Sequence, residues 1–371
     1  MKIRAFITHK LSEEFVDCQD RFCVSKDTKS IAVSDGMGES FFQDVWADLL
    51  CKYFVQNHGW LPTKDSIRPL QDEWLNLAKK HLENQELLKS PYSYLIRNAI
   101  NNRASAGATF LGVRIEDNFL KYAVIGDSCL IKLTDGIKIE RIEDIITSQQ
   151  GSFGSYPDYI DSSPIQNGKG MIKEDKIILN AGNVFLMVSD PFSDYFYDRV
   201  ITGDNCHELI SQILALKNHQ DYEKLVDEWR LQGMHNDDST LVILEFDGND
   251  DFNLEIIDDI DELIKHEGKD SAKSEQVNKE SEMKTSVTNS IITENDTVSK
   301  EKNQHDNKEI SSVASENGVE FNGKDIIPMP PNRKGEKYNK ENFRKISNDY
   351  YTNGFPYYKQ LISILLNSFK K

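Results

Sequence analysis

The stretch Ser30–Ser40, "SIAVSDGMGES", decides how the rest of the chain is interpreted. Small and β-branched residues lead to Asp35, and Gly36 and Gly38 follow closely. This pattern predicts a strand that ends in a carboxylate on a flexible turn, because Asp and Gly are common where strands stop. Taken alone, Asp35 is most simply a strand terminator, so its interpretation depends on what the other strands carry.

Aspartates stand beside four further strand-like runs. Asp127 follows "YAVIG", Asp190 follows "VFLMVS", Asp237 comes just before "STLVIL", and Asp20 precedes "RFCVS". Each one is tolerable as a turn residue in an unrelated sandwich, and the residues alone leave that alternative open. Together with Asp35 they suggest strand ends that converge on one site.

The chemistry of such a site follows from its charge. Clustered carboxylates repel one another unless cations neutralise them. Ligands that are all oxygen suit Mg²⁺ or Mn²⁺. Zinc is not expected, because no set of His and Cys residues has suitable spacing. The isolated His207 and His235 are expected to be surface or structural residues.

Composition limits the class of protein. The 371 residues carry a formal net charge of -17, which argues against a broad contact with the nucleic-acid backbone. The five cysteines are odd in number and form no C-x-x-C pair, so a reduced, cytoplasmic protein is expected. We expect no signal peptide, because the N-terminal residues lack a long apolar run. We expect no transmembrane segment, because no apolar run approaches ~18 residues.

The order of elements predicts an α+β fold. Strands flank a block of helices, which favours antiparallel sheets covered by helices over a βαβ repeat. The expected strands are residues 2–8, 21–25, 30–34, 107–115, 119–127, 129–136, 175–180, 183–190 and 239–246. The expected helices are residues 39–57, 65–88, 91–104, 206–217 and 221–231.

The composition changes near residue 247. Residues 1–247 form the predicted main folded domain, in which strands alternate with helices. Residues 248–347 are acidic and then rich in Ser, Lys, Glu, Asn and Thr, which predicts a mostly disordered linker. Residues 348–371 predict a short amphipathic helix. We expect this helix either to fold back onto the main folded domain or to dock a partner protein or a membrane surface.

Five motifs occur in one order: "VSDGMG", "GATFLGV", "VIGDS", "VSDPFSD" and "NDDSTLVIL". This ordered set resembles the metal-dependent protein phosphatases, the type 2C serine/threonine protein phosphatases, and is similar to their bacterial members. The resemblance covers about residues 1–246. It implies a four-layer αββα sandwich of two antiparallel sheets flanked by helices. It also implies hydrolysis of phosphoserine and phosphothreonine in proteins.

The resemblance assigns roles to individual residues. Asp35 resembles the aspartate that bridges two Mn²⁺ or Mg²⁺ ions, and Gly36 resembles the glycine whose carbonyl also ligates. Asp20 resembles the acidic residue of the N-terminal motif. Asp190 and Asp237 resemble the remaining ligands of the first metal. Among these residues, Asp20, Asp35 and Asp237 are the expected catalytic centre.

A third, weaker metal site is implied for Asp127 and Asp194. In the implied mechanism, a water between two divalent ions becomes hydroxide-like and attacks phosphorus in line. No covalent phosphoenzyme is needed, so no cysteine has to act as a nucleophile. The implied partners are a phosphorylated protein substrate and an opposing serine/threonine kinase.

This chain departs from the family pattern at several positions. Pro191 and Glu39 replace usual glycines, and Cys129 replaces an arginine that often follows "GDS". The N-terminal phosphate-binding arginine has no clear match, and Lys10 is the candidate substitute, acting as a point charge. These departures concern substrate binding more than metal binding. They keep open a second function, that of a pseudophosphatase acting as a metal-binding scaffold or regulator.

Overall fold

The computed structural model describes residues 1–38, 40–59, 67–90, 93–133, 142–148, 157–164, 168–203, 206–249 and 251–267. The part of the predicted linker (residues 248–347) that begins at residue 268 lies outside these residues, as does the predicted C-terminal helix (residues 348–371). Glu39, one of the departures from the family pattern, also lies outside them.

Two sheets carry most of the described strands. The six-stranded sheet has the order β13 (Asn253–Ile257), β1 (Lys2–Thr8), β12 (Ser239–Glu245), β11 (Val184–Val188), β7 (Cys129–Leu133) and β8 (Ile142–Ile146). The five-stranded sheet has the order β10 (Lys173–Ile178), β6 (Phe119–Ile125), β5 (Phe110–Glu116), β3 (Ser30–Asp35) and β2 (Asp20–Ser25). Neighbouring strands in both sheets are antiparallel, except that β13 runs parallel to β1. A small pair, β4 (Gly107–Ala108) and β9 (Ile160–Asp161), lies beside them.

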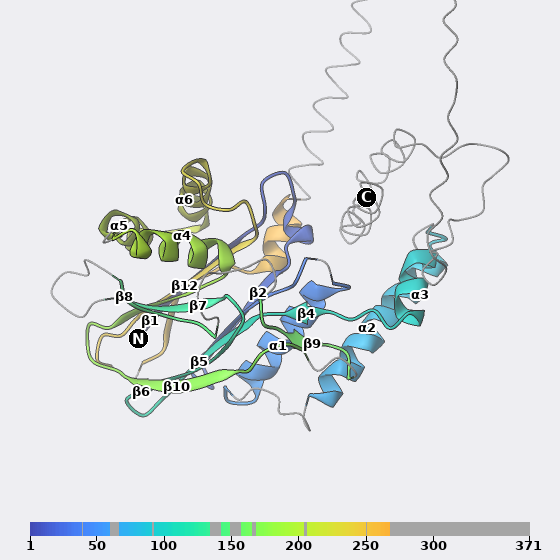
Figure 1. Ribbon diagram of the computed structural model, residues 1–371, viewed down its shortest axis with the longest axis horizontal. Helices are drawn as coiled ribbons and strands as arrows, with labels where there is room; N and C mark the ends of the chain where they lie inside the picture. Colours follow the sequence, from blue (N-terminus) through green and yellow to red (C-terminus); the bar gives the residue numbers. More distant parts are fainter. Residues whose placement is uncertain are drawn as a thin grey trace, which may run out of the picture. The chain divides into compact units, whose positions relative to one another are not determined.

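Helices cover the outer faces of the two sheets (Figure 1). On the side of the six-stranded sheet lie α4 (Asp190–Ile201), α5 (His207–Leu214) and α6 (His219–Leu231). On the other side, α1 (Gln43–Gln56) packs on β2, β3 and β5, followed by α2 (Arg68–Leu87) and α3 (Ser93–Asn101). A 3-10 turn, η1 (Phe15–Asp17), precedes β2. The predicted α+β, four-layer αββα sandwich is therefore confirmed.

Apolar side chains fill the space between the two sheets and the space between the six-stranded sheet and its helices. Between the sheets, Ile3 and Val242 of the six-stranded sheet share a core with Val33, Leu111 and Val124 of the five-stranded sheet. This alternation of buried residues fixes the register, because a slip by one residue would turn these side chains to the opposite face. The register in turn fixes which residues stand at the strand ends.

The helix α4 was missed by the sequence analysis. Pro191 is its second residue, and proline suits a first helical turn because a backbone N–H at that position would have no partner within the helix anyway. Phe192, Tyr195 and Phe196 follow at helical spacing and pack around the buried Trp229 of α6. The missing glycine of the "SDPFSD" motif is thus accommodated by a helix that begins on the motif itself.

The folded part of the chain extends past residue 247, where the sequence predicted a boundary. The strand β13 pairs with β1, and residues 260–267 are helical. Glu267 accepts a hydrogen bond from the N–H of Phe15 at 2.7 Å, and its carboxylate lies 3.4 Å from the ring of His9. Among the described residues, no helix is long and apolar enough to cross a bilayer.

Candidate active site

The β2–β3 hairpin places two carboxylates side by side. Asp20 begins β2, Asp35 ends β3, and the two residues are direct partners in the antiparallel ladder. Side chains of such partners share one face, about 5 Å apart, and like charges there are destabilising. Asp20 is fully buried, and its Oδ2 accepts a hydrogen bond from Thr240 Oγ1 of the opposite sheet at 2.7 Å. Its Oδ1 has no hydrogen-bond partner among the described residues.

The opposite sheet brings further carboxylates to this edge. The strands β11 and β12 are antiparallel, so the end of β11 meets the start of β12. Asp190 opens α4 directly after β11, and Asp194 lies one helical turn later on the same face. Asp237 stands just before β12. A negative charge in the first turn of α4 is favourable to that helix, because the helix dipole is positive there.

The connection between β6 and β7 supplies Asp127. Its side chain is buried, and within the described part of the chain its Oδ1 has no hydrogen-bond partner. The neighbouring Gly126 has a φ of 98°, and a Cβ there would lie 2.6 Å from Thr109. A tight turn with room for no side chain therefore delivers Asp127 to the cluster.

Gly36, the predicted carbonyl ligand, is required for space. A Cβ at Gly36 would lie 2.9 Å from the backbone carbonyl carbon of Gln43 at the start of α1. Its N–H donates to the carbonyl of Gln19 at 3.3 Å. The residue therefore lets the first turn of α1 approach the end of β3 closely.

Burial and mutual repulsion act on these carboxylates together. Burial raises the pKa of Asp35 well above its usual range, and the carboxylates of Asp20 and then Asp190 add most to the shift. Burial likewise raises the pKa of Asp190, with Asp237 and then Asp127 contributing. The structure thus brings together all six aspartates that the sequence singled out, namely Asp20, Asp35, Asp127, Asp190, Asp194 and Asp237.

Two members of the cluster titrate near neutral pH. Burial raises the pKa of Asp20 to about 7, and the carboxylate of Asp238 contributes next. Burial also raises the pKa of Asp127 to about 7, with added repulsion from Asp194 and Asp237. Buried carboxylates whose pKa is raised this far do not stabilise the folded protein. They are therefore more typical of functional sites than of structural positions.

The cluster fits divalent cations in its chemistry. It offers oxygen ligands alone. In the described chain, Asp20 and Asp127 each have a buried carboxylate oxygen that accepts no hydrogen bond from the protein. Nevertheless, no three His, Cys, Asp or Glu side chains of the described residues already stand in an arrangement that would hold a metal ion. The aspartates are thus neighbours that a cation would have to draw together.

The structure places Lys10 and Asp238 at the rim of the cluster. Lys10 Nζ lies 2.8 Å from Asp237 Oδ1, so the predicted phosphate-binding group is engaged by a predicted metal ligand. Asp238, which the sequence analysis did not single out, is buried and accepts the backbone N–H groups of Lys10 and Gln19 at 3.0 and 2.7 Å. Its signal in the sequence was the doubled aspartate of "NDDST".

Cys129 occupies the place of the usual arginine without reaching the surface. The residue is buried, and its Sγ lies 3.3 Å from the carbonyl oxygen of Asp127. Burial raises the pKa of its thiol to about 12, so the thiol stays protonated at neutral pH. This position packs the turn below Asp127 and supplies no cation for a phosphate.

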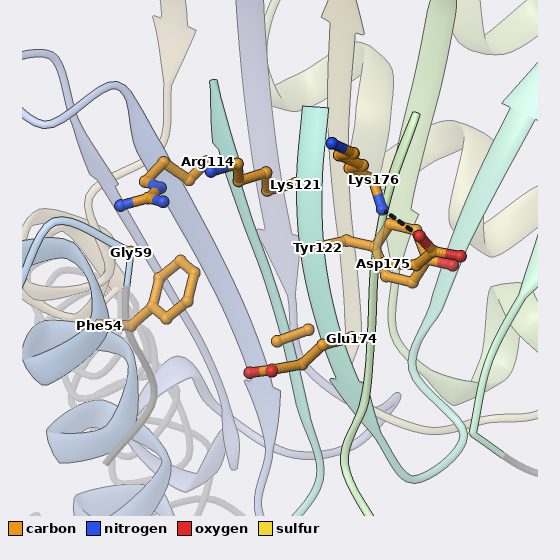
Figure 2. Close-up of a pocket in the computed structure, with 9 residues that line it drawn as sticks. Phe54, Gly59, Arg114, Lys121, Tyr122, Glu174, Asp175 and Lys176 are labelled. Carbon is orange, nitrogen blue, oxygen red and sulfur yellow. Dashed lines mark hydrogen bonds between the residues drawn. The ribbon is translucent and has the colours of Figure 1, made fainter. Parts of the chain in front are cut away.

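A separate pocket of about 270 Å³ lies between the end of α1 and strands β5, β6 and β10 (Figure 2). Two of its basic side chains already pair with a carboxylate. Arg114 pairs with Glu116 at 2.6 Å and donates to the carbonyl of His58 at 2.9 Å, and Lys121 pairs with the same Glu116. No aspartate of the cluster lines this pocket, so the carboxylate edge is the better candidate site.

A comparison with protein families matches the part of the chain that carries most of the clustered aspartates. The sequence profile of the family described as Protein phosphatase 2C matches residues 14–230, which is more than half of the chain. Lys10 and Asp237 fall outside this match. No curated protein matches the chain.

Several solved structures are similar to this chain at low identity. The catalytic domain of the serine/threonine protein phosphatase PstP, in complex with two manganese ions, is 17% identical, with a TM-score of 0.39; the match covers 65% of this chain and 96% of that one. PppA of Pseudomonas aeruginosa is 14% identical, with a TM-score of 0.39 and coverage of 66% and 97%. The phosphatase Stp1 of Staphylococcus aureus is 13% identical, with a TM-score of 0.43 and coverage of 66% and 95%.

Proposed function

Because the chain belongs to the protein phosphatase 2C family, we propose that it hydrolyses phosphoserine and phosphothreonine in proteins with the help of Mn²⁺ or Mg²⁺. Family membership supports serine/threonine phosphatase function in general and implies phosphoprotein substrates. One observation supports the finer proposal: six aspartates from both sheets meet at one edge, and burial together with repulsion from the other aspartates raises the pKa of Asp35 and of Asp190.

In this proposal the cluster holds two divalent cations and a third, weaker one. Asp35 and the carbonyl of Gly36 would be ligands of the first two ions. Asp20, Asp190 and Asp237 would complete their ligands, and Asp127 with Asp194 would hold the third. Such ions supply a nucleophilic water at neutral pH and neutralise charge on the phosphoryl oxygens.

The protein's own groups prepare the site. The hydroxyl of Thr240 fixes the orientation of Asp20 by its hydrogen bond of 2.7 Å, which also ties the two sheets together. Ser189 Oγ accepts a hydrogen bond from the N–H of Thr240 at 2.9 Å, which fixes the start of β12 beside the end of β11. This framework keeps Asp20 and Asp190 close although their charges repel. Preorganised groups of this kind need little rearrangement when the substrate arrives.

The comparisons do not support the pseudophosphatase alternative, and Pro191 fits the first turn of α4. A serine/threonine kinase that acts on the same substrate, a cytoplasmic location and docking by the C-terminal segment complete the proposal. We also propose that the chain is divided into a catalytic domain, a linker and a C-terminal helix.

The test is hydrolysis of p-nitrophenyl phosphate and of a phosphothreonine peptide, with Mn²⁺ and with EDTA. The variant Asp35→Asn is expected to lower kcat by about 10³-fold, because it removes a carboxylate that would hold the ions and so help to activate the nucleophilic water. Asp27→Asn is the matched control, because Asp27 is exposed in the turn at the other end of the same hairpin. Its activity should equal that of the wild type.

Calorimetric titration with Mn²⁺ adds a readout that does not depend on turnover. Loss of binding steps in Asp35→Asn would support the metal assignment. Unchanged two-site binding in this variant would refute it. Mn²⁺ binding by the wild type without hydrolysis of either substrate would favour a scaffold function instead.

A further inference from the structure

Asp237 is already paired with a cation of this chain. Lys10 Nζ lies 2.8 Å from Asp237 Oδ1, and the two side chains are 22% and 43% exposed. A divalent ion held by Asp237 would need the same carboxylate. It would also meet the ammonium charge at close range, where like charges repel even with partial screening by solvent.

The backbone holds these two residues together independently of the ion pair. Arg230 of α6 has a side chain that is only 4% exposed. Its Nη2 donates to the carbonyl oxygens of His9 and Asp237, at 2.8 Å each. One buried guanidinium therefore joins the segment that carries Lys10 to the segment that carries Asp237.

Two further hydrogen bonds join the same segments. The N–H of Lys10 donates to Asp238 Oδ1 at 3.0 Å, and the N–H of Leu11 donates to Asn236 Oδ1 at 2.8 Å. None of these contacts uses the ammonium group. Lys10 therefore stays beside Asp237 even when the ion pair is open, and a tethered group competes at a high effective concentration.

We propose that Lys10 is a built-in competitor of the divalent cation at Asp237, and that it sets the metal affinity of this part of the cluster. The inference rests on the proposed function, because it concerns the same metal site. When a cation takes Asp237, the ammonium group is released on its flexible four-carbon stem. It then becomes available to a phosphoryl oxygen of the substrate, which is the role predicted for Lys10 from the sequence.

The test is calorimetric titration of the full chain with Mn²⁺ alone. Lys10→Met keeps most of the side-chain length and removes the charge. We expect one binding step to become about tenfold tighter and the others to stay unchanged. Lys52→Met is the matched control, because Lys52 forms a similar pair with Asp48 on α1, at 2.6 Å, and should leave every step unchanged.

A second variant keeps the test decisive if Lys10→Met does not fold. Lys10→Arg retains the charge and can form two parallel hydrogen bonds with Asp237, so the same step should become about threefold weaker. Unchanged or opposite effects on Mn²⁺ affinity, in a wild type that does bind Mn²⁺, would overturn this inference alone. A wild type that binds no Mn²⁺ would overturn the proposed function and this inference with it.

Discussion

Replacing Asp20 by asparagine should stabilise the metal-free protein at alkaline pH. Asparagine has the same shape and can still accept the hydrogen bond from Thr240. Burial raises the pKa of Asp20 from 3.8 to about 7 in the folded chain, and Asp238 adds to the effect. Because the folded pKa is the higher one, the folded state loses stability as the pH rises through this interval, and the loss is complete above pH ~7.

The size of the effect follows from the two pKa values. At about 1.4 kcal/mol for each pH unit between 3.8 and about 7, ionisation of Asp20 costs the fold about 4 kcal/mol. The amide that replaces the carboxylate buries N–H donors, which costs about 1–3 kcal/mol. We therefore expect Asp20→Asn to gain about 1–3 kcal/mol of unfolding free energy at pH ~8. Near pH ~4 it should instead lose about that amount, because only the amide cost remains.

The measurement is urea unfolding in EDTA at both pH values, followed by circular dichroism. Mn²⁺ should then stabilise the wild type more than the variant, because the variant has lost a ligand. Asp27→Asn, in the exposed turn of the same hairpin, should change neither result. An equal loss of stability in Asp20→Asn at both pH values would show that Asp20 carries no unfavourable charge in the fold.

Two further predictions concern the α4–α6 layer. Trp229→Ala should lower the unfolding free energy by about 3–5 kcal/mol, because the ring is fully buried among Phe192, Tyr195 and Phe196; a loss below about 1 kcal/mol in urea unfolding would contradict the packing described. Pro191→Gly should cost about 1 kcal/mol and change kcat more than Mn²⁺ affinity, because Asp190 keeps its place; wild-type kinetics would show that the proline has no effect on catalysis.

The sequence predicted the sandwich because its core strands carry their own signal. Val33 and Leu111 lie in apolar runs bounded by turn residues, and those runs became β3 and β5. The strand β13 was missed because "NLEII" is short and lies in an acidic stretch. It becomes a strand through its parallel pairing with β1, which no local pattern records.

The candidate site was predictable to a similar degree. Aspartates at strand ends could be found from the chain, because antiparallel pairing brings such ends to common edges. The pairing of Lys10 with Asp237 could not, because it depends on contacts between distant segments that Arg230 and Asp238 create. Packing between layers, rather than any local propensity, decides where an ammonium group will lie.

The position of β1 has a consequence for how the chain acquires its fold. The two ladder neighbours of β1 are β12 and β13, so the first strand of the chain pairs only with strands that are synthesised much later. Such distant pairing must close a long loop of chain before it is rewarded, which slows folding. During synthesis both edges of β1 are open to other chains, until β12 pairs with one edge and β13 pairs with the other. A nascent chain interrupted before residue 253 should therefore be prone to aggregate, whereas one that extends a little further completes its sheet.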